Sequence, residues 1–182
     1  MTAVPRELVT ERLVLRAWRG EDAEELRPIL LVNQEHLKPW IPESTYSAPP
    51  LPELVARLDG LAAVFDAGGA FRYAIRDRTT GRVLGGMSLF PHDGTRRVTL
   101  AEADRVEIGY WLDAAVTGRG YVTEAVRALL DVSATLPNVT HAEIRCHVDN
   151  APSAAVPKRL GFELTGVVDG MQVWRRGLPG GR

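Results

Sequence analysis

Residues 106–125 read VEIGYWLDAAVTGRGYVTEA, and this stretch decides the fold. Residues 105–112 have an apolar-rich strand pattern, whereas residues 120–136 repeat apolar side chains at helical spacing. Gly118 and Gly120 lie in the turn between these two elements, where glycine allows positive φ and a close approach to the backbone. The helix that follows presents free N–H groups at the positive end of its dipole. The segment therefore predicts a main-chain cradle for a pyrophosphate group.

The glycine pair has alternative interpretations. The simplest is that Gly118 and Gly120 only make a tight turn, since short glycine patterns are common. A dinucleotide-binding Rossmann site is the second, and it would imply a nicotinamide-dependent oxidoreductase. Against it, the loop follows the fourth or fifth strand rather than the first, and the spacing is Gly-x-Gly-x-x-Thr. A P-loop is excluded because no Gly-Lys-Ser/Thr follows the turn.

The flanking sequence supplies more strands than helices. Strand patterns occupy residues 8–18, 71–77, 82–90, 141–148, 162–168 and 171–176, and helical patterns occupy residues 52–67 and 150–160. Another amphipathic stretch begins at residues 20–22; Pro28 is expected to kink or split it, and residues 36–42 are expected to form a loop. We expect an α+β fold with a mixed, mostly antiparallel central sheet of about seven strands, flanked by helices. The unit at residues 106–148 adds a parallel pair with a right-handed crossover.

Size and composition restrict the class of protein. The chain has 182 residues, of which 45% are hydrophobic and 25% charged, as expected for one globular domain. We expect that domain to span residues 1–177 and residues 178–182 to form a loose tail. The formal net charge of -1 gives no long-range attraction to nucleic acid or to an anionic membrane. The single cysteine, Cys146, and a sequence without signal-peptide or membrane-span patterns predict a cytoplasmic protein.

Four segments of the chain resemble the GCN5-related N-acetyltransferase (GNAT) family, and within it the branch of ribosomal-protein alanine acetyltransferases. Residues 10–16 (TERLVLR) resemble that branch's opening strand, and residues 36–40 (HLKPW) resemble the loop after its first helix. Its acetyl-CoA signature is similar to residues 106–112 together with residues 118–125. Its closing motif is similar to residues 150–153 (NAPS) together with residues 158–162 (KRLGF). The resemblance covers most of the chain. It implies the GNAT fold, in which the sheet is splayed between the fourth and fifth strands.

The resemblance also implies that acetyl-CoA is the cosubstrate and that no metal is needed. Its pantetheine arm would lie in the splay against exposed main chain at Trp111, Leu112 and Asp113. Its pyrophosphate would accept hydrogen bonds from the N–H groups of Gly118, Arg119, Gly120, Tyr121, Val122 and Thr123. Asn150 and Ser153 match side chains that border the pantetheine and its sulfur.

Acetyl transfer to an amine requires a base, a donor for the oxyanion and a partner for the leaving thiolate. Glu107 is the candidate base and acceptor-site residue, because it lies near the expected splay and matches a base position in some relatives. Its alternative role is that of a solvated or ion-paired strand residue. Ser153 is the candidate partner of the thiolate, or else a first-turn helix residue that satisfies a free N–H. Trp40 lines the acceptor pocket or is a packing anchor between two prolines.

The sequence therefore predicts an N-acetyltransferase that moves the acetyl group of acetyl-CoA to a primary amine by direct attack in a ternary complex. The resemblance implies a protein N-terminal amine or a small-molecule amine as the acceptor. Ala115 and Thr117 depart from the family pattern, and the closing helix lacks the tyrosine that many relatives use as a general acid. These departures leave a second hypothesis, a catalytically inactive CoA-binding sensor or interaction module. The chain is expected to be a monomer or a homodimer.

Overall fold

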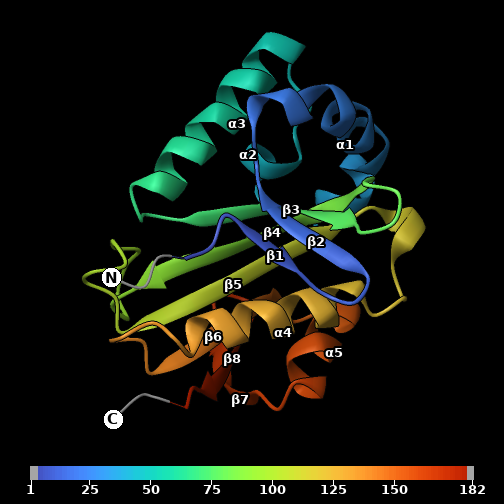
Figure 1. Ribbon diagram of the computed structural model, residues 1–182. Helices are drawn as coiled ribbons and strands as arrows, with labels where there is room; N and C mark the ends of the chain where they lie inside the picture. Colours follow the sequence, from blue (N-terminus) through green and yellow to red (C-terminus); the bar gives the residue numbers. More distant parts are fainter. Residues whose placement is uncertain (1–3, 180–182) are drawn as a thin grey trace.

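An eight-stranded sheet runs through the centre of the molecule (Figure 1). The computed structural model describes residues 4–179, and its strands lie in the order β1-β2-β3-β4-β5-β6-β8-β7. All neighbouring strands are antiparallel except β5 and β6, which are parallel. The α+β class and the mostly antiparallel sheet are thus confirmed. The strands are β1 (Glu7–Val9), β2 (Leu13–Ala17), β3 (Phe71–Asp77), β4 (Val83–His92), β5 (Arg105–Leu112), β6 (His141–His147), β7 (Glu163–Val168) and β8 (Met171–Gly177).

The sheet has one strand more than predicted, because the segment expected as a single strand at residues 8–18 folds back on itself. β1 and β2 pair as an antiparallel hairpin. In its turn the N–H of Thr10 donates to the carbonyl of Leu13 at 2.9 Å, and the N–H of Leu13 donates to Thr10 Oγ1 at 3.1 Å. The threonine hydroxyl thus supplies the turn chemistry that glycine or asparagine provides in most hairpins.

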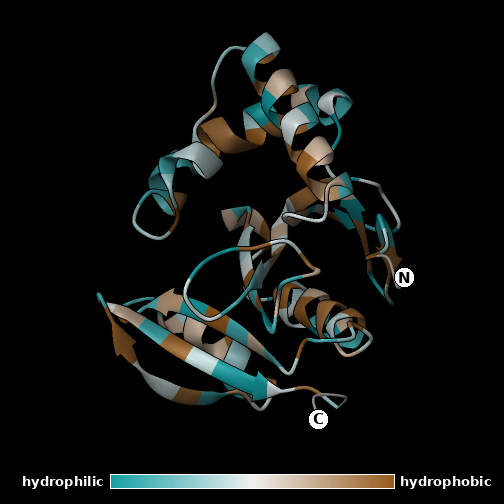
Figure 2. Ribbon diagram, turned by 90° about the vertical axis from the view of Figure 1, so that its left-hand side faces the viewer, coloured by the Kyte–Doolittle hydropathy of each residue, from teal (hydrophilic) through white to brown (hydrophobic). Residues whose placement is uncertain are grey.

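Helices cover both faces of the sheet (Figure 1). On one face lie α1 (Ala23–Leu37), α2 (Glu43–Tyr46) and α3 (Leu51–Asp66), preceded by the 3-10 turn η1 (Gly20–Asp22). On the other lie α4 (Tyr121–Ser133) and α5 (Ala151–Arg159), and a second 3-10 turn, η2 (Ala114–Val116), precedes α4. Figure 2 shows hydrophobic and hydrophilic residues interspersed along the helices and strands, as expected where one side of each element is buried.

Two apolar clusters hold these layers together. The larger packs the sheet against α4 and α5 and includes Leu15, Ile75, Ile108 and Leu129, each with at most 1% of its surface exposed. The smaller packs α1 and α3 against the opposite face around Leu30, Leu54 and Ala74. Because strand side chains alternate between faces, Ile75 and Ala74 serve different clusters although they are adjacent.

Proline does not split α1, which corrects one expectation. The helix runs without interruption from Ala23 to Leu37 and contains Pro28 in its second turn. At that position proline removes a single N–H donor, while the apolar face formed by Leu26, Leu30 and Leu37 stays buried. The helix therefore also takes in the first two residues of the segment 36–42 that was expected to form a loop. Pro157 is likewise accommodated inside α5.

The sheet opens between β5 and β6. These are the fourth and fifth of the predicted strands, between which the resemblance implied a splay, because the first predicted strand forms both β1 and β2. The two strands pair only from Arg105↔His141 to Ile108↔Ile144. Beyond that point β5 continues to Leu112 and β6 to His147 without pairing with each other. β5 stays paired with β4 along its whole length, and β6 with β8. The gap therefore leaves one edge of each strand free for a ligand.

The end of the described chain returns to the sheet. Leu178 is buried at 8% exposure, and its N–H donates to the carbonyl of Thr140 at 2.9 Å. Residues 180–182 of the expected tail lie outside the described residues. In the described range, none of the helices has the length and apolar character needed to cross a membrane.

Candidate active site

The gap between β5 and β6 exposes main-chain groups of β5. The N–H of Asp113 donates to the carbonyl of Leu84 on the β4 side at 2.8 Å. Hydrogen-bonding directions alternate along an antiparallel strand, so the main-chain groups of Tyr110 and Leu112 point the other way, into the gap. Of the three residues predicted to expose their main chain here, Leu112 does so. Asp113 does not, because its N–H is bound by Leu84, and Trp111 does not, because its carbonyl faces Gly85 of β4.

The α5 side of the gap is closed by a contact between Tyr110 and Ser153. The Tyr110 hydroxyl donates to the carbonyl of Ser153 at 2.9 Å, and Ser153 Oγ lies 3.3 Å from the same hydroxyl. Asn150 caps α5, its Oδ1 accepting from the Ser153 N–H at 3.2 Å. Burial raises the pKa of Tyr110 above its ordinary value, so this hydroxyl keeps its proton at neutral pH. Burial also raises the pKa of the neighbouring Cys146 thiol.

A buried asparagine holds the end of β5 in place. Asn33 of α1 is 1% exposed; its Oδ1 accepts from the N–H of Ala114 at 2.8 Å, and its Nδ2 donates to Asp113 Oδ1 at 3.1 Å. The same Asp113 oxygen accepts from the N–H of Ala115 at 3.1 Å and caps η2. Arg82 pairs with the other Asp113 oxygen at 3.1 Å. The loop that leads to the glycines is therefore fixed by polar contacts at its start.

The glycine loop has the conformation that an anion cradle requires. Gly118 and Gly120 have φ angles of +75° and +78°, which side chains other than glycine rarely adopt. Gly120 is the N-cap of α4, and the first main-chain bond of the helix runs from the N–H of Glu124 to its carbonyl at 3.1 Å. Gly120 has no side chain to cap the helix, so the N–H groups of residues 121–123 stay available to an anion.

The β1–β2 turn clamps this loop through Glu124. Glu124 Oε1 accepts from Thr10 Oγ1 at 2.6 Å and from the N–H of Arg12 at 2.8 Å, and Oε2 accepts from Arg12 Nε at 2.7 Å. Arg12 Nη1 also donates to the carbonyl of Arg119 at 2.9 Å, and its guanidinium lies 4.7 Å from the centre of the Tyr121 ring. The turn and the loop, more than 100 residues apart in sequence, are thus held as one unit.

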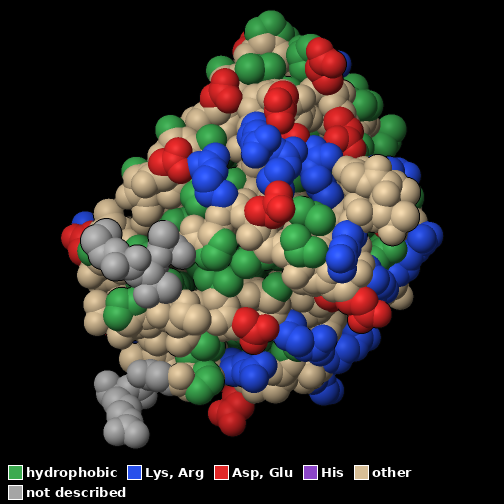
Figure 3. Space-filling view, in the orientation of Figure 1, with side chains coloured by type: hydrophobic (Ala, Val, Ile, Leu, Met, Phe, Trp, Pro, Cys, Tyr) green, Lys and Arg blue, Asp and Glu red, His purple; other side chains and the backbone are tan. Residues whose placement is uncertain are grey.

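A polar hollow adjoins the cradle. It has a volume of about 950 Å³, and Gly118 and Gly120 line it. Its charged lining consists of three arginines and three carboxylates, namely Arg12, Arg127, Arg159, Glu11, Glu124 and Asp131. Figure 3 shows Lys and Arg side chains gathered at the lower right, where Figure 1 places the start of α4 and α5. The main-chain N–H groups of the cradle are therefore the feature that suits a polyphosphate ligand, since the arginines of the hollow are matched in number by its carboxylates.

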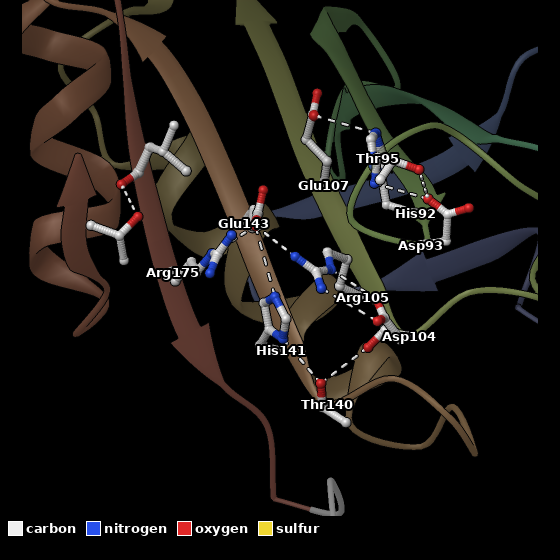
Figure 4. A network of polar contacts seen from close by, with 12 residues as sticks. His92, Asp93, Thr95, Asp104, Arg105, Glu107, Thr140, His141, Glu143 and Arg175 are labelled. Atoms are coloured by element: carbon white, nitrogen blue, oxygen red, sulfur yellow. Dashed lines mark hydrogen bonds and ion pairs between the residues drawn. The ribbon is translucent and has the colours of Figure 1, made fainter. Parts of the chain in front are cut away.

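The opposite face of the gap carries charged side chains (Figure 4). Glu107 lies in the paired part of β5, one residue before its last partner with β6, and its side chain is 18% exposed. Arg97, Arg145 and His92 approach its carboxylate to 3.6, 3.7 and 3.9 Å. Within residues 4–179 this carboxylate accepts no hydrogen bond, so both of its oxygens can accept one from a ligand.

Glu143 is the second carboxylate of this face, and it has a structural role. It is 3% exposed, and its side chain accepts a hydrogen bond from Arg175 Nε at 2.7 Å. Burial alone would raise the pKa of Glu143, but the hydrogen bonds and charges of Arg175 and Arg145 outweigh it and lower the pKa below its ordinary value. Glu143 is therefore ionised, and its oxygens accept hydrogen bonds from its arginine partners.

Trp40 lies on the same side as these carboxylates. Its ring centre is 5.8 Å from that of His147, at the end of β6 that borders the gap, and 36% of the residue is exposed. In the described range no group of three or more His, Cys, Asp and Glu residues is arranged to bind a metal ion.

Comparison with protein families matches residues 12–163 to the acetyltransferase (GNAT) domain. This chain belongs to the GNAT family. The Bacillus subtilis protein YdaF, named provisionally as a ribosomal N-acetyltransferase, is 30% identical over 168 residues, which is 91% of this chain and 86% of YdaF. The ribosomal-protein-serine acetyltransferase of Escherichia coli is 42% identical over 60 residues, about a third of each chain. The structure of RimL, a ribosomal L7/L12 alpha-N-protein acetyltransferase solved with coenzyme A, aligns with a TM-score of 0.79 at 24% identity and covers 96% of this chain and 98% of RimL.

In this GNAT protein most of the predicted cofactor residues lie on one face of the gap, whereas the Trp111 side chain packs against the cluster of α1 and α3 on the other. Leu112, the loop 118–123, Asn150 and Ser153 all border the gap or its entrance. Glu107 and Trp40 lie on the opposite face. Both sides of the gap thus carry predicted residues, whose individual roles remain predictions. Asp113 differs from its prediction because its side chain and its N–H serve the fold.

Four residues that the sequence analysis assigned no role complete the site: Asn33, Arg12, Glu124 and Tyr110. A sequence signal existed for Asn33, since it falls on the apolar face of its helix with Leu26 and Leu30, where a polar side chain needs a buried partner. Arg12 lies in the segment 10–16 and Glu124 in the segment 118–125, both of which resemble family motifs. Their pairing depends on the β1–β2 hairpin, which was not predicted.

Gly118→Ala is expected to weaken acetyl-CoA binding by about tenfold, because the methyl group would project into the hollow in front of the cradle. Gly81→Ala is the matched control, since Gly81 has a φ of +74° and, like Gly118, has no other atom within 4 Å of an added Cβ. Both variants should lose about 1 kcal/mol of folding stability from the positive φ. Calorimetric titration should show a loss of acetyl-CoA affinity for Gly118→Ala alone. Equal acetyl-CoA affinities of the two variants would contradict the assignment of the Gly118 loop as the anion cradle.

Glu124→Gln is expected to lower the free energy of unfolding at pH 7 by about 1–2 kcal/mol. Burial raises the pKa of Glu124, but hydrogen bonds from Thr10 and Arg12 outweigh it, so the folded-state pKa lies below the unfolded value. A lowered carboxylate pKa stabilises the fold above the unfolded pKa of about 4.3, and this contribution is lost as pH falls through the folded pKa.

The difference between Glu124→Gln and the wild type should therefore shrink when urea denaturation is repeated near pH 3. Glu35→Gln, on the exposed side of α1, should change neither curve. A difference that is independent of pH would show that the Glu124 clamp does not depend on its charge.

Proposed function

We propose that this chain transfers the acetyl group of acetyl-CoA to a primary amine by direct attack in a ternary complex. One observation carries the proposal. The gap between β5 and β6 has an anion cradle and free main chain on one face, and on the other a partly buried carboxylate that accepts no hydrogen bond from residues 4–179. Such a gap lets a thioester and an amine meet from opposite sides of the sheet, which brings the reactants together without a covalent enzyme intermediate.

In the proposed reaction Glu107 takes a proton from the incoming amine, directly or through one water molecule. The neutral amine then attacks the thioester carbonyl, and the oxyanion accepts a hydrogen bond from main chain near Leu112. Collapse of the tetrahedral intermediate breaks the C–S bond, and the extra proton on the new amide nitrogen passes to the departing sulfur, so that the products are the amide and the free CoA thiol. Ser153 Oγ, which lies 3.3 Å from the Tyr110 hydroxyl, supplies a hydrogen bond to that sulfur as it leaves.

We favour a protein N-terminal amine as the acceptor. This preference is supported by the names of relatives, which include a ribosomal-protein-serine acetyltransferase. Trp40 and the charged face around Glu107 would line the acceptor site. A small-molecule amine is the alternative acceptor. The proposal places the enzyme in the cytoplasm, as a monomer or a homodimer.

A catalytically inactive CoA-binding module is the second candidate function. Two observations favour it: α5 carries no tyrosine, and cationic side chains approach Glu107 on several sides. In such a module Glu107 would be an ion-pair residue, and the cradle would bind CoA without turnover.

The two candidates differ in thiol release. Purified protein is incubated with acetyl-CoA and a set of short peptides with free N-termini, with small amines in parallel, and free CoA thiol is measured. The enzyme hypothesis predicts acceptor-dependent thiol release and a mass increase of one acetyl group on the acceptor. Saturable acetyl-CoA binding with no thiol release for any acceptor would favour the inactive module.

A further inference from the structure

Two arginines flank one aromatic ring next to Glu107. Phe90 of β4 is the register partner of Glu107, so its side chain lies on the same face of the sheet. The Cζ atom of Arg97 lies 3.6 Å from the centre of the Phe90 ring, and that of Arg72 lies 5.1 Å from it. Both distances are measured to the same ring centre, so the two Cζ atoms can be no farther apart than the sum of the distances, which is 8.7 Å.

The positive charge at this ring is not balanced by the described residues. Glu107 is shared by Arg97 at 3.6 Å and Arg145 at 3.7 Å. The Arg72 guanidinium has neither an ion-pair nor a hydrogen-bond partner within residues 4–179, although the residue is half-buried. Burial lowers the pKa of Arg72, and the charges of Arg97 and Arg57 lower it further. An anion placed here would relieve both burial and like-charge repulsion.

The geometry distinguishes this pair from ordinary surface arginines. A planar guanidinium stacked on an aromatic ring is held in orientation, and it matches the two oxygens of a carboxylate or phosphate. The ring that orders both groups is the partner of Glu107, so a bound anion would lie close to the reacting amine.

We propose that Arg72 and Arg97 form an anion subsite, which selects amine acceptors carrying a carboxylate or a phosphate within about one residue of the amine. This inference rests on the proposed acetyltransferase function, since it specifies the acceptor of the same site. It predicts a preference for N-termini followed by an acidic or phosphorylated residue over N-termini followed by a neutral one.

The test compares the binding of matched tetrapeptides in the presence of CoA, which occupies the cofactor side without reacting. The peptides Ser-Glu-Ala-Ala, Ser-phosphoserine-Ala-Ala and Ser-Gln-Ala-Ala are titrated into the protein by calorimetry. The wild type is expected to bind at least one anionic peptide about tenfold more tightly than the neutral one. The carboxylate and phosphate peptides distinguish the two sources of negative charge.

Variants then identify the residues responsible. R72Q and R97Q should each bring the preference close to unity, with retained acetyl-CoA binding as the check on folding. R96Q is the control, since Arg96 is 75% exposed and pairs with Asp93 at 3.5 Å, and it should keep the wild-type preference. Equal binding of anionic and neutral peptides by the wild type, including no binding of either, would overturn the subsite. A preference that survives both R72Q and R97Q would do the same.

The subsite and the enzymatic function can fail separately. Thiol release is measured with the same peptides and acetyl-CoA. Equal acetylation of anionic and neutral peptides would leave the acetyltransferase function standing and overturn the subsite. Selective binding of anionic peptides without acetyl transfer would leave the subsite standing and contradict the proposed function.

Discussion

Glu107→Gln lowers kcat for acetyl transfer by about 100-fold or more, while the Kd for acetyl-CoA stays unchanged. The amide has nearly the same shape as the carboxylate and cannot accept the proton of the amine. The loss corresponds to at least about 2.7 kcal/mol of transition-state stabilisation. Acetyl-CoA affinity is unaffected because the cradle lies on the other face of the gap, and the cations near the Glu107 carboxylate, Arg97, Arg145 and His92, are not cradle residues.

Steady-state kinetics with a responsive acceptor, combined with calorimetric titration of acetyl-CoA, checks this expectation. Glu102→Gln is the control, since Glu102 is an exposed carboxylate that accepts hydrogen bonds from Thr99 in the loop after β4. It should change neither quantity. Unchanged turnover in Glu107→Gln would remove Glu107 as the base and leave it as an ion-pair residue, with the family assignment intact.

Gly85→Ala should cost about 3 kcal/mol of folding stability, at the upper end of the effects of overpacking. A Cβ at Gly85 would lie 2.1 Å from the Trp111 carbonyl oxygen and 2.9 Å from the Leu112 Cα. Both atoms are backbone, so the clash is relieved only if the paired ends of β4 and β5 separate. These ends border the gap, so the variant should also bind acetyl-CoA more weakly than the wild type.

Gly60→Ala is the matched control for this substitution. Gly60 lies inside α3, and an added Cβ there meets no atom within 4 Å. Alanine is the better helix former, so this variant should gain up to about 1 kcal/mol. Urea denaturation of both variants measures the two effects with opposite signs. A Gly85→Ala variant as stable as the wild type would mean that β4 and β5 are not packed as closely as the structure describes.

The parts of the site that follow from neighbouring residues were predictable from the sequence. The cradle needs only glycines at the right spacing between a strand and a helix, and Gly118 and Gly120 have the required positive φ. Strand alternation along residues 105–112 puts Glu107, Gly109 and Trp111 on one face, and it holds along β5 because its register with β4 has no bulge.

Contacts between distant segments were not predictable in the same way. Arg72, Phe90 and Arg97 meet because β3, β4 and the following loop come together in one register, which no local pattern specifies. The hairpin of β1 and β2 was missed since residues 8–18 alternate almost continuously and their turn has no glycine or proline. The Arg12–Glu124 clamp depends on that hairpin and was missed with it.

The central claim is that the gap and the glycine cradle bind acetyl-CoA, and calorimetric titration of the purified protein with acetyl-CoA tests it most directly, with NAD as the control ligand. We expect saturable binding of acetyl-CoA at one site per chain and no binding of NAD. No binding of acetyl-CoA, or binding of NAD in its place, would contradict it.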